Sequence, residues 1–309
     1  MDIYRSAAEI PSPRAARAVA IGNFDGLHLG HRRIVERLKK GAAALDVPAC
    51  VLTFSPHPEK VFGPARLHMI QTLDQRLRGL REWGVDAVVV WPFNRDFARL
   101  DGEAFAQRIL AARLNARLVV VGDDFRFGRG RSAGPAALKR FGRAHGFSVL
   151  AVPHLKRGGR IVRSSRIRNF LDKGLVEAAA GLLGRPYLVE GDVVAGRGIG
   201  RTLGYPTANI LTPNEILPRG VFITHLEWKG RRHPSVTSVG VRPTFGKGAL
   251  AVECHVLDFH SDLHGEPVRL FFLRRLRDER KFRDADALRG RIDADAAAAR
   301  AYFRRRPHL

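Results

Sequence analysis

The hydrophobic pattern of the chain changes at Leu183-Gly184-Arg185-Pro186. Before this point, continuous valine-rich apolar runs alternate with segments of helical period, and after it short apolar stretches are broken by Gly and Pro. The first pattern predicts a parallel sheet of buried strands flanked by helices. The second predicts an antiparallel barrel or sandwich. We therefore expect two domains, residues 1–184 and 185–309.

The elements expected from these patterns can be given by residue range. In the first domain we expect strands at Ala18–Ile21, Ala49–Phe54, Ala87–Trp91, Arg117–Val121 and Ser148–Val152. The helices expected between them are Arg32–Leu45, Leu73–Trp83, Gly102–Leu114, Gly134–His145 and Arg166–Lys173. In the second domain we expect strands at Tyr187–Val194, Val221–Trp228, Ser235–Val239, Ala251–Phe259 and Val268–Leu273, then a helix from Asp284 to Phe303.

Composition excludes several classes of protein. Hydrophobic residues make up 45% of the 309 residues, which is enough for a sizeable core and argues against wholesale disorder. The first residues are not followed by a signal-peptide-like apolar stretch, and no segment approaches the roughly 20 apolar residues of a transmembrane helix. Cys50 and Cys254 lie inside apolar runs, so we expect buried thiols and a reducing, cytoplasmic location.

The net charge of +23, from 53 Lys and Arg against 30 Asp and Glu, favours anionic partners. The charge is spread along the chain, and no zinc-finger spacing or aromatic RNA-binding motif accompanies it. Nucleic-acid binding is therefore not expected as the main function. Small phosphorylated substrates account for part of the charge.

A glycine-rich turn, Gly22–His31, links the first expected strand to the first expected helix. Unpaired backbone N–H groups in such a turn, together with a helix N-terminus, favour a bound phosphate. His28 and His31 are three residues apart and share one face of a helical turn. Taken alone, such a pair is more often a surface or capping feature, and zinc lacks supporting ligands at a suitable spacing. The segment resembles the HxGH signature of nucleotidylyltransferases.

Three further segments follow in order. Thr53–Pro58 and Val121–Gly128 end two expected strands, where open α/β sheets bind ligands, although each also suits an ordinary loop or turn. Arg163–Arg168 opens a helix, where its serines could simply cap the helix or could hold a triphosphate together with Arg168.

The four segments together resemble the FAD-synthetase domain of prokaryotic bifunctional riboflavin kinase/FAD synthetases, whose pattern is GxFDGxHxGH, FxPHP, VGxDFRFG and SSTxIR. Two positions depart from it: Arg163 stands for the first Ser of the last motif and Ser165 for its Thr. Ser165 keeps the hydroxyl, and the charge of Arg163 should not repel a triphosphate.

The resemblance implies that the phosphate of FMN attacks the α-phosphorus of ATP and pyrophosphate leaves, with Mg²⁺ assisting. The nucleophile is already an anion, so charge stabilisation is needed rather than a general base. The implied catalytic residues are His28, His31 and Arg168. The implied ATP-binding residues are Gly22, Asn23, Phe24, Asp25, His28, His31, Ser164, Ser165 and Arg168, and the implied flavin-binding residues are His57, Asp124 and Phe125.

The second domain carries its own glycine-rich segment, Gly191–Asn209, without the GKS or GKT of a P-loop. A flexible hairpin is the simpler interpretation, but the density of glycines and the following Pro-Thr-Ala-Asn favour a nucleotide site. Thr207 and Asn209 alternate in an extended segment, so both oxygens could reach a hard cation. With Val239–Phe245, Val252–Phe259, Asp262–Gly265 and Leu276–Phe282, the segment resembles the riboflavin kinase module over about residues 185–283.

This second resemblance implies that Glu253 is the general base for the ribityl 5′-hydroxyl, and that Arg277 lies on the flavin side. Thr207 and Asn209 are the implied metal ligands, and with Gly196, Gly198 and Gly200 they form the implied ATP site. Ser238 stands where relatives often have Asn, and His264 where they often have Tyr. We expect neither departure to touch the chemical groups.

The expected enzyme therefore converts riboflavin to FMN and FMN to FAD, using ATP and Mg²⁺ at two sites. Its expected partners are riboflavin, FMN, FAD and ATP. Three alternatives stay open at this point: only one module works, the acceptor is another mononucleotide such as nicotinate mononucleotide, or the fold is reused to bind nucleic acid. The kinase module argues against the second alternative.

Overall fold

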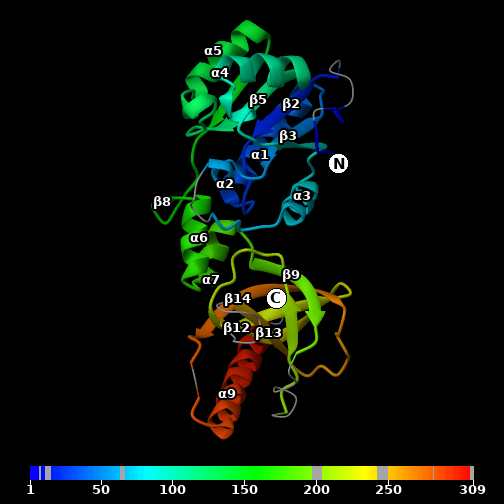
Figure 1. The fold of residues 1–309 in the computed structure, drawn as a ribbon, viewed down its shortest axis with the longest axis vertical. Helices are drawn as coiled ribbons and strands as arrows, with labels where there is room; N and C mark the ends of the chain where they lie inside the picture. The colour runs from blue at the N-terminus through cyan, green and yellow to red at the C-terminus, as the bar shows by residue number, and fades with distance from the viewer. Residues whose placement is uncertain are drawn as a thin grey trace. The chain divides into compact units, whose positions relative to one another are not determined.

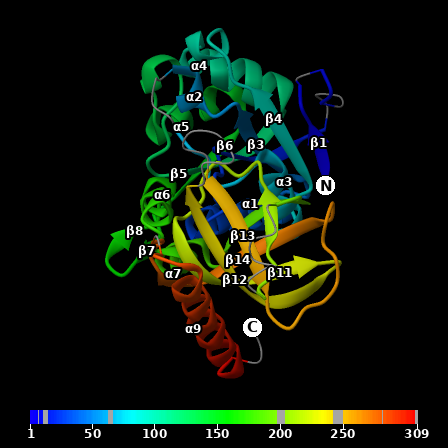
Figure 2. The same ribbon diagram turned by 60° about the horizontal axis from the view of Figure 1, so that its bottom comes forward.

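The computed structural model describes residues 1–6, 8–10, 15–62, 67–196, 204–241, 250–280 and 282–306. These residues form two compact units, Met1–Ser164 and Ser165–Leu309 (Figures 1 and 2). Residues 165–184, expected from the sequence in the first domain, thus pack with the second unit. Whether the boundary of independent folding lies at residue 185 stays a prediction.

The first unit is built on a six-stranded parallel sheet in the order β1-β4-β3-β2-β5-β6 (Figure 1). Its strands are β1 (Asp2–Tyr4), β2 (Arg17–Ile21), β3 (Ala49–Ser55), β4 (Ala87–Pro92), β5 (Ala116–Gly122) and β6 (Ser148–Val152). The predicted doubly covered parallel sheet is confirmed. The edge strand β1 was not predicted, because its three residues are too few to show a period.

Helices cover both faces of this sheet. They are α1 (Leu29–Ala44), α2 (Pro58–Phe62), α3 (Leu73–Glu82), η1 (Phe97–Arg99), α4 (Gly102–Ala104), η2 (Phe105–Arg113), η3 (Arg129–Arg131) and α5 (Pro135–His145), followed by the hairpin β7 (Lys156–Arg157) and β8 (Arg160–Ile161). Alternate residues of β2 point to opposite faces of the sheet: Ala18 and Ala20 pack in one buried cluster, and Val19 and Ile21 pack in the other. Such full burial explains the continuous apolar runs of the sequence.

One predicted helix, Gly102–Leu114, differs in kind. After the short α4, residues Phe105–Arg113 form a π-helix, which ends with the Leu114 N–H donating to the Ile109 carbonyl at 2.9 Å. The apolar period of the segment shows that it is helical but does not separate the two hydrogen-bond patterns.

The order of the strands determines where a ligand can bind. The chain moves from β2 through β3 to β4 on one side, and through β5 to β6 on the other. The strand order therefore reverses between β2 and β5, and the segments that follow these two strands flank the crevice expected at such a point. These segments contain the Gly22–His31 turn and the Asp123–Gly128 loop.

The second unit is a closed antiparallel barrel in the order β10-β13-β12-β11-β14-β9, which confirms the predicted barrel (Figure 2). Its elements are α6 (Ser164–Asp172), α7 (Val176–Leu183), β9 (Tyr187–Val194), β10 (Ala208–Leu211), β11 (Gly220–Trp228), β12 (Arg231–Val241), β13 (Leu250–Val256), β14 (Pro267–Arg277) and α9 (Ala285–Arg304). The sequence patterns did not predict α2, α7 or β10 as separate elements.

The terminal helix α9 packs on the barrel through Ala296 and Ala299, against a buried cluster that includes Ile223 and Leu257. Small residues on α9 allow this close approach. Among the residues that the structure describes, no helix is both long and apolar enough to cross a membrane.

Both cysteines are free and buried, as the sequence predicts. Burial raises the pKa of Cys50 to about 12 and that of Cys254 to about 11, so neither thiol ionises near neutral pH.

Candidate active sites

The turn after β2 is held in a conformation that few residues adopt. Phe24 and Leu27 have positive φ angles of 51° and 42°, although neither is glycine, and Gly26 has a φ of 89°. Positive φ at non-glycine residues is costly and is found where the surrounding structure enforces it. Phe24 and Leu27 are almost fully buried, so the packing of their side chains in the core holds the turn in this conformation.

Hydrogen bonds from buried polar groups hold the same turn. The carboxylate of Asp25 is only 2% exposed and accepts hydrogen bonds from the backbone N–H groups of Ile70, at 3.1 Å, and Gln71, at 3.3 Å. The buried Arg76 donates to the Asn23 carbonyl at 2.6 Å, and the Thr53 hydroxyl donates to the same oxygen at 3.2 Å. Burial lowers the pKa of Arg76 while the nearby Asp25 carboxylate raises it. Asp25 therefore shapes the turn.

The two histidines lie at the start of α1 with their rings stacked, at 3.6 Å between centroids and 11° between planes. His28 is the N-cap, and its Nδ1 accepts a hydrogen bond from the backbone N–H of His31 at 3.2 Å. Gly30 makes this packing possible, because a Cβ on residue 30 would lie 3.0 Å from the His28 ring. The two rings share one face, as expected, and His28 also caps the helix α1.

The cap also determines the form of His28. A ring nitrogen that accepts from an N–H group carries no proton, so Nδ1 is the unprotonated nitrogen. The proton of the neutral ring then resides on Nε2, which becomes a hydrogen-bond donor. A neutral donor of this kind can bind a phosphate oxygen without transferring a proton.

His57 lies beside the turn rather than apart from it. Its Nε2 is 2.8 Å from the amide nitrogen Nδ2 of Asn23, its Nδ1 accepts from the backbone N–H of Glu59 at 3.2 Å, and the residue is 7% exposed. The structure thus brings a residue predicted for the flavin side into contact with one predicted for the ATP side.

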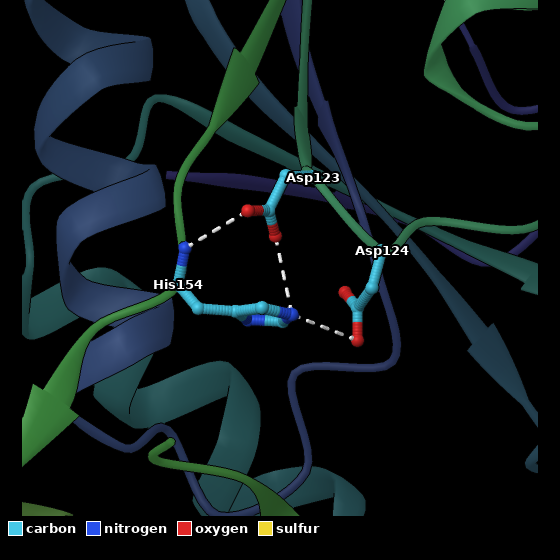
Figure 3. A group of neighbouring side chains, drawn as sticks. All are labelled: Asp123, Asp124 and His154. Atoms are coloured by element: carbon cyan, nitrogen blue, oxygen red, sulfur yellow. Dashed lines mark hydrogen bonds and ion pairs between the residues drawn. The ribbon is translucent and has the colours of Figure 1, made fainter. Parts of the chain in front are cut away.

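The loop after β5 carries a cluster of charged groups (Figure 3). Nε2 of His154 lies 3.1 Å from the Asp123 carboxylate and 3.2 Å from that of Asp124, and the His154 N–H donates to Asp123 at 3.3 Å. Arg163 lies 3.4 Å from Asp124. The three side chains of Figure 3 are close enough to share a cation, but the adjacent guanidinium makes this an ion-pair network. His154 and Arg163 orient Asp124.

A series of aromatic rings runs between the segment after His57 and this loop. Phe62, which is 60% exposed, contacts Phe93 edge to face with ring centroids 6.0 Å apart, and Phe93 continues to Phe97. The series ends at Phe125, whose ring is stacked on Phe127 at 5.4 Å. Phe105 and Phe127 are buried in the core of the first unit, so the series is mainly core packing that supports Phe125 and the exposed Phe62 at its two ends.

Ser164, the last residue of the first unit, is joined to the turn after β2. The hydroxyl of Ser164 donates to the carbonyl of Asp25 at 2.9 Å, so the fourth motif is joined to the first. Ser165 and Arg168 follow on α6 and belong to the second compact unit. Their part in ATP binding stays a prediction, as does the direct contact of Gly22, Asn23 and Phe24 with ATP.

The second site lies on the barrel wall. The strand register pairs Asn209 of β10 with Glu253 of β13, and Glu253 with Ser238 of β12. Directly paired residues have side chains on one face about 5 Å apart, so these three are neighbours. Val252 and Cys254 are buried, so Glu253 lies on the opposite face of its strand, outside the barrel core.

Two further observations concern the predicted ATP segment. A Cβ on Gly196 would lie 1.9 Å from the Asn209 side chain, so only glycine allows this approach. Thr207 lies directly before β10, and the His255 ring bonds to the Pro206 carbonyl at 2.9 Å, which fixes the backbone there. Gly198 and Gly200 lie outside the described residues.

Arg277, predicted for the flavin side, is engaged elsewhere. Its Nε and terminal nitrogen lie 2.9 Å and 2.8 Å from one carboxylate oxygen of Asp295, which is buried on α9. The pair joins the end of β14 to the terminal helix. A direct contact of Arg277 with flavin stays a prediction.

Comparisons with known proteins identify both modules. The family described as FAD synthetase matches residues 11–166, and that described as riboflavin kinase matches residues 183–303. The bifunctional riboflavin kinase/FMN adenylyltransferase of Escherichia coli K12 is 34% identical over 298 residues, covering 94% of each chain. That of Pseudomonas fluorescens is 36% identical over 303 residues, covering 97% of each. The chain belongs to this bifunctional family.

One solved structure supports the fold over the whole length. A crystal structure from Streptococcus pneumoniae, named as a macrolide-efflux protein, has a TM-score of 0.87 and 30% identity, covering 96% of this chain and 98% of its own. The predicted family resemblance is therefore confirmed for both modules and for their order.

For a member of this bifunctional family, the structure adds residues that the motifs did not reveal. Arg76 and Thr53 hold the Asn23 carbonyl, and His154 orients the Asp123–Asp124 pair. His154 follows the end of β6, and that position at the carboxyl edge of the sheet was the available signal. Ser238 is the cross-strand neighbour of Glu253, and its lack of contact with the chemical groups stays a prediction.

Proposed function

We propose that the two reactions of this enzyme family are carried out by the Gly22–His31 site and the Glu253 site. The chain is a riboflavin kinase and an FMN adenylyltransferase: ATP phosphorylates riboflavin to FMN, and a second ATP adenylylates FMN to FAD with release of pyrophosphate. Family membership over nearly the whole chain carries this conclusion.

In adenylyl transfer, we assign His28 and His31 to the charge that develops on the α-phosphoryl oxygens. Stacking and the helix cap fix both rings before ATP binds, and preorganised donors stabilise a transition state at little reorganisation cost. Positively charged Arg168 and the hydroxyls of Ser164 and Ser165 hold the triphosphate. The FMN phosphate needs no base because it is already an anion.

On the flavin side, we assign Asp124 and Phe125 to the acceptor. The flat aromatic face of the isoalloxazine ring suits the ring of Phe125, which Phe127 supports from the core, since offset and edge-to-face ring contacts are favourable. His154 and Arg163 hold the Asp124 carboxylate in one position, so it can orient a polar edge of the ring.

In the kinase, we assign Glu253 as the base that accepts the proton of the ribityl hydroxyl while the γ-phosphoryl group is transferred to that oxygen. Asn209 and Thr207 supply the amide and hydroxyl oxygens that suit Mg²⁺, which would neutralise the phosphates when bound. The neighbouring register positions of Asn209 and Glu253 support this assignment, because base and metal ligand must meet at one hydroxyl. Gly196 allows the glycine-rich segment to approach them.

Both reactions take place in the cytoplasm under this proposal, in line with the two unoxidised, buried thiols. The test is to incubate the purified chain with riboflavin, ATP and Mg²⁺ and to separate the flavins by chromatography. We expect FMN to form first and then to decline as FAD accumulates. FMN without FAD would refute the assignment of the first site, and no flavin turnover combined with salt-sensitive binding of nucleic acid would favour the nucleic-acid alternative.

A further inference from the structure

The side chains of His57 and Asn23 form a hydrogen bond whose direction can be deduced. The Glu59 N–H can only donate, so Nδ1 of His57, 3.2 Å away, must accept and carries no proton. Pro58 between them has no N–H group of its own, which leaves Glu59 as the first backbone donor after His57. The proton of the neutral ring must then be on Nε2.

The consequence for Asn23 follows from the short distance. Nδ2 of Asn23 lies 2.8 Å from Nε2, and two N–H donors cannot form a hydrogen bond with each other. With Nε2 protonated, the amide must be turned by 180°, so that its oxygen accepts from Nε2–H. Oxygen and nitrogen of an amide are assigned from their hydrogen bonds rather than seen directly. The amide oxygen therefore faces His57, and the NH₂ group faces the opposite way.

We propose that His57 is a positioning residue of FAD synthesis, which acts through Asn23 by turning the Asn23 amide so that its NH₂ group donates to a phosphate oxygen of ATP. The inference rests on the proposed function of the Gly22–His31 site. It replaces a direct contact of His57 with flavin, predicted from the sequence, by a contact with the nucleotide side.

The surroundings of the pair support this role. His57 is 7% exposed, whereas Asn23 is partly exposed in the nucleotide-binding turn. Arg76 and Thr53 hold the carbonyl of Asn23, so its backbone cannot turn to compensate. An amide rotated the other way would present its oxygen to an anionic phosphate, which is repulsive. His28 has the same protonation pattern: its Nδ1 also accepts from a backbone N–H, that of His31, so its Nε2 also carries the proton.

The first experiment measures the protonated nitrogen directly. In protein labelled with ¹⁵N-histidine, the resonances of His57 are identified by their loss in His57→Asn. We expect Nε2 to carry the proton and Nδ1 to be unprotonated. A proton on Nδ1 would overturn the inference, whether or not the enzyme makes FAD.

The second experiment separates ATP from FMN in the kinetics of FAD synthesis. His57→Asn keeps an acceptor near the position of Nδ1 but lacks a donor at Nε2, whereas His57→Gln can keep the donor. A hydrogen bond to a charged group is worth enough to change an equilibrium by about tenfold or more. We therefore expect His57→Asn to lower kcat/KM for ATP by about tenfold, to leave KM for FMN unchanged, and to be largely rescued in His57→Gln. A rise in KM for FMN alone in both variants would establish direct flavin contact instead.

A double-mutant cycle completes the test. In an Asn23→Ala background, His57→Asn should cost nothing further, because the amide it orients is gone. Additive losses would overturn the inference. Urea unfolding of the same variants reports that the first unit is folded, and riboflavin phosphorylation reports the same of the second unit. If the parent chain made no FAD at all, the proposed function would fail, while the nitrogen resonances would still decide the direction of the hydrogen bond.

Discussion

The two active sites obtain their geometry in different ways. In the first unit, the turn after β2 adopts unfavourable backbone angles. It is held by its own buried Asp25, which binds the backbone of Ile70, and by Arg76 and His57 from distant segments. In the second unit, the register of three neighbouring strands places Asn209, Glu253 and Ser238 side by side. The adenylyltransferase site should therefore be sensitive to residues that never touch substrate, and the kinase site mainly to those that do.

The largest expected effect separates the two sites outright. Glu253→Gln removes the base but keeps the size of the side chain, so riboflavin phosphorylation should fall by about a thousandfold. FAD synthesis from supplied FMN should continue at the parent rate, since it uses the other site. Product chromatography with each substrate in turn measures both rates. Equal loss of the two activities would contradict the two-site assignment.

The opposite separation is expected for His31→Ala. Loss of one transition-state donor should lower kcat for FAD synthesis by about a hundredfold, while riboflavin phosphorylation is retained. The ring also stacks on His28, so the structure of the variant turn should be checked by its thermal unfolding. A variant that made FAD at the parent rate would show that the histidine pair has no role in the chemistry.

The sequence was a good guide to the elements and to the residues within motifs. The alternation of apolar runs identified five of the six strands of the sheet, and the glycine-rich turns marked both sites. Local patterns could not show contacts made by the tertiary fold. Arg76 lies on an ordinary helix, and its hydrogen bond to Asn23 spans 53 residues. Likewise, the position of Ser238 beside Glu253 depends on strand register, which the motifs do not contain.

Motifs also did not distinguish side chains that face a ligand from those that face the core. Phe24 and Asp25 lie within the nucleotide-binding motif, but they are 0% and 2% exposed. Their side chains serve the conformation of the turn. Arg277 likewise lies in the flavin-side segment, but its guanidinium binds Asp295.

The third prediction tests whether the first site depends on its buried supports. Asp25→Ala removes the acceptor of two backbone N–H groups and leaves the buried Arg76 without its neighbouring negative charge. We expect the first unit to lose about 3 kcal/mol of stability and FAD synthesis to fall with it. Kinase activity should persist. The matched control is Glu82→Ala, an exposed acidic residue on α3, and urea unfolding followed with each activity measures the difference.

If Asp25→Ala unfolded both units together, or had no more effect than Glu82→Ala, the contrast between the two sites would not hold. Loss of FAD synthesis with an unchanged unfolding curve would instead assign Asp25 a direct contact with ATP.

The fourth prediction concerns the second unit and its dependence on pH. His225 is 5% exposed and packs on Phe303 of α9, and its two ring nitrogens make no hydrogen bond within the described part of the chain. Burial, with the nearby Arg232 and His233, lowers its pKa to about 4 from an ordinary 6.5. The unfolded chain therefore binds a proton between pH 6.5 and 4 that the folded barrel does not bind.

The free energy of unfolding is therefore greatest above pH 6.5 and falls as the pH is lowered towards 4. This residue accounts for about 3 kcal/mol of that loss. His225→Leu should reduce the dependence of the unfolding free energy on pH between 6.5 and 4. The control His260→Gln, at an exposed position, should leave that dependence unchanged. Unfolding by urea at a series of pH values, followed through kinase activity, measures both. An unchanged slope in His225→Leu would show that another group is responsible.

The smallest expected effect tests whether strand register alone places groups at the kinase site. Ser238 and His264 both differ from the residues common in the family, but only Ser238 is paired with Glu253, whereas His264 lies exposed in a loop. Ser238→Asn adds an amide that can donate to the Glu253 carboxylate and orient it, and a net hydrogen bond of about 1 kcal/mol corresponds to a rise of about fivefold in kcat/KM for riboflavin. His264→Tyr, the matched replacement, should change the same quantity by less than about twofold, as expected for a surface substitution. Equal effects of the two replacements would mean that proximity to Glu253 does not decide the outcome. A loss of activity in Ser238→Asn alone would mean that the position senses the size of the side chain, because the wall beside Glu253 then has no room for the amide.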